Sequence, residues 1–310
     1  MREVAIIGYS RTPTAAEDTR SEAELVQAVV SGALEQAGLS RKDIEFYCSG
    51  SCDYVMGRPF SFVMALDGIA PWPPVAESHV EMDGAFALYE AWVHLQMGHI
   101  QTALVYSFGK TSLCDIEAVT NAQLDPYTLA PLGVTGSELA ALQAGAVGAD
   151  FQGPTWGDGA AAVVLAAGDT ARRLCSRPAW IRGIAHNIEP HAPGMRDLTR
   201  SASSHRAAAA ANVHTLPSVD IAELHAAYAH QIPILSAALG LPETATINPS
   251  GGALADEIPM VSGLIRIGEA AHRLMDGSAR TAVAHATSGP CMQQNLVCAL
   301  ASESVGADHG

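Results

Sequence analysis

Short apolar runs alternate with helical periods along almost the whole chain, and this alternation limits the possible folds more than any other feature. Apolar runs of four to eight residues between turn signals indicate buried strands, and amphipathic periods between them indicate covering helices. The sequence therefore predicts an α/β protein with a mostly parallel sheet. In the first half we expect strands at Val4–Ile7, Ile44–Ser49, Thr102–Phe108 and Ala160–Ala166, and helices at Glu22–Ala37 and Gly84–Met97.

The second half repeats this theme. We expect strands at Trp180–His186, Thr244–Ile247, Ala279–Ala286 and Asn295–Ala301, and helices at Ile221–Leu239 and Ser262–Met275. A chain of 310 residues suits one large domain or two fused similar halves. We place the halves at residues 1–170 and 171–310.

Composition excludes several classes of protein. A formal charge of −15 argues against nucleic-acid binding, which needs clustered Lys and Arg. No stretch has the about 18 to 20 uncharged apolar residues of a membrane span, and the N-terminus has no signal-peptide pattern, so we expect a cytoplasmic protein. The six cysteines are scattered without zinc-ribbon spacing, which predicts reduced thiols and no metal site.

The segment 247–263, INPSGGALADEIPMVSG, resembles an active-site loop of the thiolase superfamily. In that family a run opening N-P-x-G-G leads to a catalytic histidine followed by proline. Ile258 stands where the family has this histidine. The matching residues are Asn248, Pro249, Gly251, Gly252, Ala255, Pro259 and Gly263.

Three other segments extend the resemblance over the chain: REVAIIGYSRTP (2–13), WGDGAAAVVLA (156–166) and AELHAAYAHQ (222–231). The first is similar to the opening strand and turn of the sterol-carrier-type branch, which includes lipid-transfer proteins and steroid side-chain aldolases, and the other two resemble blocks of the thiolase family. The resemblance implies the thiolase fold, in which two similar halves form a five-layered αβαβα sandwich. Residues 111–155 would form a shortened loop region, or cap, over the acyl-CoA site.

The stretch HVEMDGAFALYEAW (79–92) corresponds to the segment that carries the thiolase nucleophilic cysteine. Asp83 occupies the cysteine position or lies beside it. A carboxylate suits a helix N-terminus but is a poor acyl carrier, so ordinary thiolysis is disfavoured. Asp83 is either an N-cap or a base whose pKa burial would have to raise, and the two roles are compatible.

His225 matches the residue that opens the family block lining the oxyanion hole, where a positioned donor stabilises the developing charge. The alternative is a histidine satisfied by backbone groups. Tyr228 lies about one helical turn further, on nearly the same face of the expected helix, and it is either an acid–base group or a core residue in place of Phe.

The block AVAHATSGPCMQQN (282–295) corresponds to the loop of the second catalytic cysteine. If this block is aligned with the family by its strand, His285 falls at the catalytic position, and a histidine suits a general base near neutral pH. Alignment on the cysteine selects Cys291 instead, a candidate nucleophile.

Two further groups are candidates for holding coenzyme A. Arg196, Arg200 and Arg206 form the densest basic cluster of an acidic chain, which favours either a phosphate clamp or a solvated helix face. The resemblance also implies that the loop at 250–252, with Ser250, Gly251 and Gly252, contacts coenzyme A. We expect no separate cofactor, because coenzyme A would be part of the substrate.

These residues imply an acyl-CoA carbon–carbon lyase that performs retro-aldol cleavage of a β-hydroxyacyl-CoA, with sterol side chains as the substrate suggested by the family. The resemblance also implies a homodimer and an OB-fold and zinc-ribbon partner that closes the site. The alternative is a non-catalytic thiolase-like subunit paired with such a partner or with an active thiolase paralogue.

Overall fold

Ten strands form one mixed sheet in the computed structural model, which describes residues 2–72, 75–254 and 256–303. In the first half, the strands are β1 (Val4–Arg11), β2 (Phe46–Gly50), β3 (Ala76–Val80), β4 (Thr102–Lys110) and β5 (Asp158–Ala167). The helices of this half are α1 (Glu22–Ala37), α2 (Ser61–Ile69), α3 (Gly84–Met97), α4 (Ile116–Ala122) and α5 (Gly136–Ala146).

After α6 (Gly168–Leu174), the second half contains β6 (Ala179–Ile188), β7 (Ile221–Leu224), β8 (Thr246–Ile247), β9 (Thr281–Ser288) and β10 (Gln294–Ala301). Its helices are α7 (Ala202–Ala210), α8 (Gln231–Leu239) and α9 (Ser262–Met275). The strand order is β3-β2-β4-β5-β1-β6-β10-β9-β7-β8. Read outward from the β1–β6 contact, the two halves therefore have the same topology.

The prediction of a mostly parallel sheet is wrong. Parallel pairing is limited to β2 with β3 and β4, and β7 with β8 and β9. The pairs β1–β5, β1–β6, β4–β5, β6–β10 and β9–β10 are antiparallel. Strands buried on both faces give continuous apolar runs whatever their direction, so the pattern could not distinguish the two kinds of pairing.

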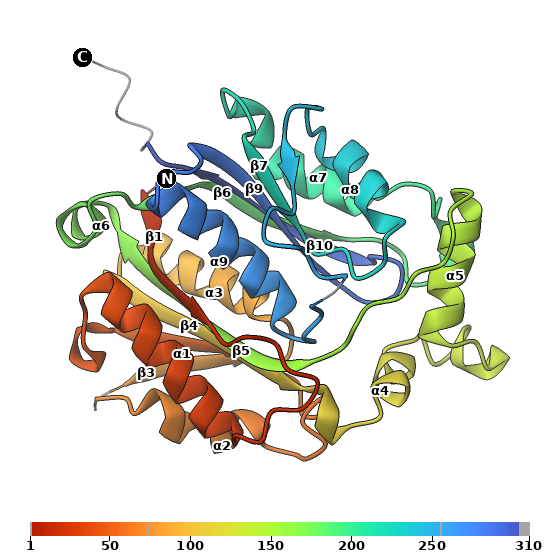
Figure 1. The fold of residues 1–310 in the computed structure, drawn as a ribbon, viewed down its shortest axis with the longest axis horizontal. Helices are drawn as coiled ribbons and strands as arrows, with labels where there is room; N and C mark the ends of the chain where they lie inside the picture. The colour runs from red at the N-terminus through yellow and green to blue at the C-terminus, as the bar shows by residue number, and fades with distance from the viewer. Residues whose placement is uncertain (1, 73–74, 255, 304–310) are drawn as a thin grey trace.

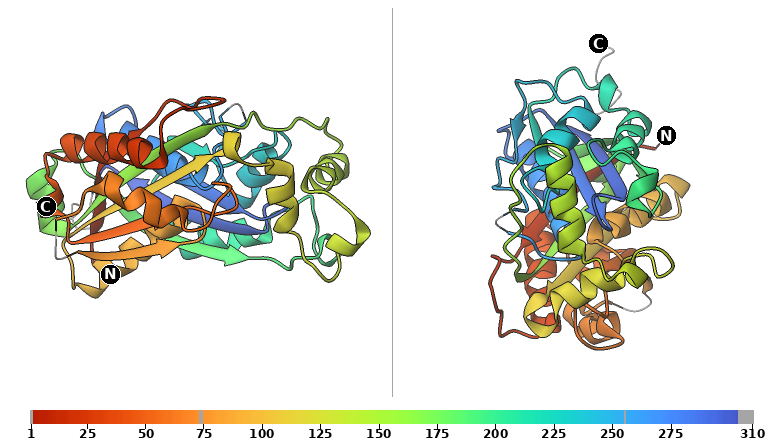
Figure 2. Two further views of the ribbon diagram at one scale, coloured as in Figure 1. Left: turned by 90° about the horizontal axis from the view of Figure 1, so that it is seen from below. Right: turned by 90° about the vertical axis from the view of Figure 1, so that its right-hand side faces the viewer.

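Three apolar cores lie between the layers of helices and strands that Figure 1 shows. The central core contains α3 and α9 between the two halves of the sheet, with Leu88 and Leu264 fully buried. A second core lies under α1 and α2, and a third lies under α7 and α8. Figure 2 shows the same arrangement from two other sides. The layers follow the predicted αβαβα order.

The predictions for α1, α3 and α9 are confirmed to the residue, because each is a long periodic segment. Helix α1 begins at a capping box formed by Ser21 and Glu24 and ends at Gly38 in the left-handed region. The helix predicted at Ile221–Leu239 is wrong in its first part. The segment begins as strand β7, and helix α8 starts only at Gln231.

The cysteines fit the expectation of reduced thiols, since all six are free. Within the described ranges, no helix has the length and apolar character needed to cross a membrane.

Candidate active site

Asp83 joins the N-termini of the two central helices. It is the N-cap of α3, where Oδ1 accepts a hydrogen bond of 2.8 Å from the Ala85 N–H. The same carboxylate accepts from two backbone N–H groups of α9, Gly263 at 2.9 Å and Leu264 at 3.0 Å. The predicted capping role is therefore present, and it extends to a second helix.

Two glycines permit this close approach of α3 and α9. A Cβ at Gly263 would lie 2.5 Å from Asp83 Oδ1, and one at Gly84 would lie 2.9 Å from the Leu264 Cδ2 of α9 and 2.6 Å from the Ser107 Cβ of β4. Neither position has room for a side chain. The Asp-Gly pair at 83–84 and the Ser-Gly pair at 262–263 thus allow the positive ends of two helix dipoles to face the buried carboxylate of Asp83.

His225 and Glu257 form a buried acid–base pair beside Asp83. His225 Nε2 lies 3.0 Å and 3.2 Å from the two carboxylate oxygens of Glu257. The Thr287 N–H donates to His225 Nδ1 at 3.3 Å, which places the proton of the neutral ring on Nε2, facing Glu257. His225 lies just after β7, in a loop and not in the helix that the sequence predicted.

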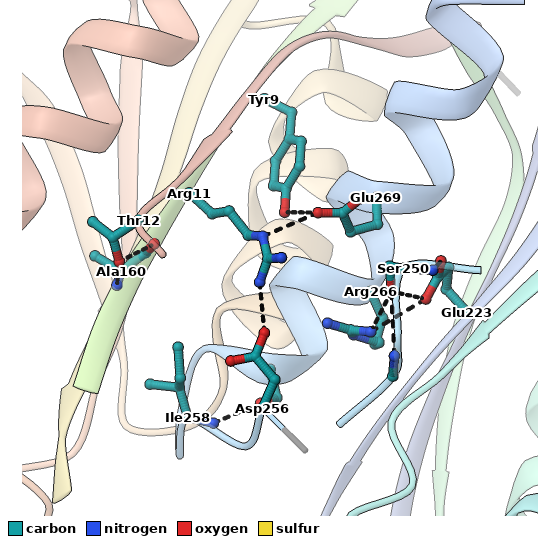
Figure 3. A network of polar contacts seen from close by, with 12 residues as sticks. Tyr9, Arg11, Thr12, Ala160, Glu223, Ser250, Asp256, Ile258, Arg266 and Glu269 are labelled. Atoms are coloured by element: carbon teal, nitrogen blue, oxygen red, sulfur yellow. Dashed lines mark hydrogen bonds and ion pairs between the residues drawn. The ribbon is translucent and has the colours of Figure 1, made fainter. Parts of the chain in front are cut away.

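The loop that carries Glu257 is anchored on both sides (Figure 3). Arg11 of β1 holds Asp256, the preceding residue, at 2.8 Å. The Ile258 N–H donates to the Ser262 Oγ at 2.9 Å, and the Ile258 side chain is buried in the central core. Ile258 therefore presents an apolar side chain to the core, while Glu257 supplies an ionisable group one residue earlier.

Burial and neighbouring charges both shift the pKa values of His225 and Asp83. Burial acts to lower the pKa of His225, but the Glu257 and Asp83 carboxylates outweigh it and raise the pKa overall. Burial raises the pKa of the Asp83 carboxyl, although His225 and the backbone donors act against that rise.

A cavity of about 140 Å³ opens in front of these three residues. Helices α4 and α5 of the cap and the loop after β9 complete its walls. Its described lining is Val55, Asp83, Ile116, Val119, Thr120, Gln123, Gly136, Ala140, Trp156, His225, Ala227, Tyr228, Gln231, Glu257, Pro259, Met260, Thr287, Ser288, Gly289, Pro290, Cys291 and Met292.

Two further predicted residues, Tyr228 and Cys291, lie in this lining. Burial, aided by the charge of Glu257, raises the pKa of Tyr228, so its phenol stays protonated at neutral pH. Burial raises the pKa of Cys291 to about 11, and its Sγ lies 3.3 Å from the Leu139 carbonyl oxygen. Cys291 is therefore a protonated thiol at neutral pH and a weak nucleophile.

The structure does not bring His285 into the cavity. Its ring is fully buried on β9, where Nε2 lies 2.9 Å from Asn295 Oδ1 and 3.5 Å from Ser204 Oγ. Burial lowers the pKa of His285 to about 3. The ring is neutral and sealed, so the predicted role as a general base has no geometric support.

The three arginines proposed as a phosphate clamp have other partners. Arg196 donates to the backbone carbonyls of Cys291 and Pro290 at 2.9 Å and 2.7 Å. Arg206 donates to Asn187 Oδ1 at 2.8 Å, and the exposed Arg200 lies 3.4 Å from Asp197. None of the three belongs to the described cavity lining. Arg196 instead supports the loop that carries Cys291.

The loop proposed to contact coenzyme A is tied into the protein. The Ser250 N–H and hydroxyl both donate to Glu223, at 3.0 Å and 2.7 Å, and Arg266 donates to the Ser250 Oγ at 2.7 Å (Figure 3). Gly251 and Gly252 have left-handed φ values. None of these three loop residues is in the described lining. Ala255, which also matched the motif, falls outside the described residues.

Glu257 is the site residue that sequence reasoning missed. The family motif drew attention to position 258, and the partner of Glu257 lies 32 residues away along the chain. The sequence does contain one signal for it: Glu257 is an acidic residue next to Ile258, the position that the family resemblance assigns to a histidine. No group of three or more His, Cys, Asp or Glu in the described ranges could hold a metal ion.

Comparison with known proteins supports the fold. No family model matches the sequence, and no curated protein matches it. Among solved structures, human mitochondrial 3-ketoacyl-CoA thiolase in complex with CoA matches with a TM-score of 0.72. The match covers 98% of this chain and 98% of that chain, at 15% sequence identity. The chain therefore has the thiolase fold, and the reaction has to be argued from the site.

Proposed function

We propose that this chain is a thiolase-fold acyl-CoA lyase that cleaves a β-hydroxyacyl-CoA by a retro-aldol reaction. The observation that carries the proposal is the buried His225–Glu257 pair at the cavity floor, beside a carboxylate that caps two helices. Because three backbone N–H groups occupy the Asp83 oxygens, this residue is unsuited to carry an acyl group. Coenzyme A is proposed as the carrier because the human thiolase of matching fold was solved with it.

In the proposed reaction Glu257 is the base. Its carboxylate takes the proton of the β-hydroxyl, the Cα–Cβ bond breaks, and its electron pair moves to the thioester as an enolate. The proton then passes from Glu257 to Cα, giving a shorter acyl-CoA and an aldehyde or ketone. No covalent intermediate on the protein is needed.

His225 and Tyr228 assist from the same cavity. The Nε2–H of His225 orients the Glu257 carboxylate and stabilises its ionised form. The protonated phenol of Tyr228 is a donor for the enolate oxygen as charge develops there. The raised pKa of Tyr228 supports this role, because a phenolate could not donate.

The alternative is a non-catalytic subunit in a complex with an active thiolase paralogue. The apolar Ile258 and the protonated Cys291 favour it, since both remove groups that thiolysis uses. Under this alternative the His225–Glu257 pair would only support the fold.

Association with other chains is part of both proposals. Strand β3 is an edge of the sheet, with β2 as its neighbour. If β3 of one copy paired antiparallel with β3 of a second copy, with the two Ser78 residues opposite each other, Glu77 of each copy would face His79 of the other. Such a pairing of an acidic with a basic side chain supports a two-fold homodimer. An OB-fold and zinc-ribbon protein, or a thiolase paralogue, is the proposed heterologous partner.

The test is to recover the tagged protein with its bound partners and to assay cleavage of β-hydroxyacyl-CoA esters, sterol-derived ones included. His225→Ala should abolish cleavage, while His272→Ala, the same change at a half-exposed histidine on α9, should not. Thermal melting would verify that both variants fold. If an active thiolase co-purifies and its turnover ignores His225→Ala, the chain is a structural subunit.

A further inference from the structure

The carboxyl and imidazole groups of the cavity lining are those of Asp83, His225 and Glu257, which we call the floor. The cap helix α4 contributes the apolar Ile116 and Val119 and the polar Thr120 to the opposing wall, with Gln123 just beyond its end. Under the proposed function, the floor receives the reacting hydroxyl and thioester groups. The rest of the acyl chain must fit against the cap helices.

The cap wall is fixed in place by several contacts. The Gly136 N–H at the start of α5 donates to Asn121 of α4 at 2.8 Å. Gln143 of α5 contacts Leu198 and His230 of the second half, at 3.1 Å each. These contacts hold α4 and α5 against each other and against the second half.

A small apolar core fixes the same helices from behind. Leu124, Leu129 and Leu139 pack against Cys291, so the cap is joined to the loop after β9. Moving the wall outward would expose this core to water, which costs about 25 cal/mol per Å² of apolar surface. The cavity volume is thus a property of the packed structure.

We infer that this chain accepts only short acyl groups, of about the size of 3-hydroxybutyryl, an inference that rests on the proposed function. The cavity of about 140 Å³ is close to the roughly 150 Å³ that holds one benzene molecule. Benzene has six non-hydrogen atoms, and a 3-hydroxybutyryl group has four carbons and two oxygens. A sterol nucleus has several times as many atoms, so this volume does not fit the sterol substrate suggested by the family resemblance.

The test is calorimetric binding of CoA, butyryl-CoA and octanoyl-CoA to the whole protein. These thioesters lack the β-hydroxyl, so binding is measured without turnover. We expect butyryl-CoA to bind about tenfold or more tighter than CoA, since its chain is buried, and octanoyl-CoA to gain nothing over CoA. Tighter binding of octanoyl-CoA than of butyryl-CoA would overturn the inference and leave the proposed function standing.

Variants of the cap sharpen this test. Ile116→Ala should enlarge the cavity and increase the affinity for octanoyl-CoA, whereas Ala140→Leu should fill it and weaken butyryl-CoA binding about tenfold. Ala146→Leu makes the same change at an exposed position of α5 and should bind butyryl-CoA as the wild type does. Failure of all three ligands to bind the wild type would contradict the proposed function itself, and the size inference with it.

Discussion

Two buried acid–base pairs lie side by side in this protein, and only one of them faces a cavity. Glu223 of β7 pairs with Arg266 of α9 at 3.2 Å, and both side chains are almost completely buried. His225, two residues further along the chain, pairs with Glu257 at 3.0 Å. The first pair is sealed by Ser250, while the second lines a cavity of about 140 Å³.

The comparison shows that access, and not burial or charge, separates a structural pair from a candidate catalytic one. Glu223 uses its oxygens on Ser250 and Arg266, so no ligand could take a proton to it. Glu257, in contrast, lines the cavity. Breaking the His225–Glu257 pair should therefore mainly reduce activity, whereas breaking the Glu223–Arg266 pair should mainly reduce stability.

The largest expected effect is on activity. Glu257→Gln keeps an oxygen that can accept from His225 Nε2–H but removes the base, so cleavage should fall about 10²- to 10⁴-fold in a protein that still folds. Glu243→Gln, the same change at an exposed residue, is the control. Steady-state kinetics and urea unfolding would be measured together. Unchanged kcat/KM in Glu257→Gln would remove Glu257 from the mechanism.

Breaking the sealed pair should mainly affect stability. Arg266→Met leaves the Glu223 charge buried without its cation, and the free energy of unfolding should fall by about 3–5 kcal/mol. Adding Glu223→Gln neutralises that charge, so the double variant should recover part of the loss. Urea unfolding of the three proteins measures both steps. A loss below about 1 kcal/mol for Arg266→Met would show that the sealed pair contributes little.

The cavity pair should also give stability a dependence on pH. Glu257 and Asp83 raise the folded-state pKa of His225 above the unfolded value of about 6.5. Protonation of His225 therefore stabilises the fold fully below about pH 6.5, and this contribution is lost as pH rises through the folded pKa. In Glu257→Gln, an NMR titration should find the His225 pKa lowered. The same midpoint in both proteins would mean that the two side chains do not interact.

The smallest expected effect is at Cys291. Its pKa of about 11 keeps the thiol protonated at neutral pH, so Cys291→Ser should leave cleavage largely unchanged. Iodoacetamide treatment of the wild type should likewise not inactivate it. A large loss in either experiment would instead indicate thiolase-type covalent catalysis.

Much of the fold could be predicted from the sequence because its signals are local. Helices α3 and α9 have long periods, and α3 begins at an Asp-Gly pair and ends at Gly98. The family resemblance supplied the layer order. Strand β7 could not be distinguished from the helix that follows, because four buried residues carry no clear period.

The site was harder to predict because its contacts are long-range. Asp83, His225, Tyr228 and Cys291 were all candidates, and all four line the cavity. Glu257 was missed because its position depends on the adjacent Asp256, which is held by Arg11, 245 residues before Asp256 in the chain. His285 was selected by alignment along a strand, yet its environment is set by Asn295 and Ser204 on other elements.

The most direct measurement is hydrogen–deuterium exchange at Cα of butyryl-CoA in D₂O, followed by mass spectrometry. By microscopic reversibility, the base that returns a proton to the enolate also removes one from the product acyl-CoA. Our proposal predicts exchange by the wild type together with its co-purifying partners, a loss of about 10²-fold or more in Glu257→Gln, and little change in Cys291→Ser. Wild-type exchange no faster than the buffer alone, or exchange that is unaffected by Glu257→Gln, would contradict it.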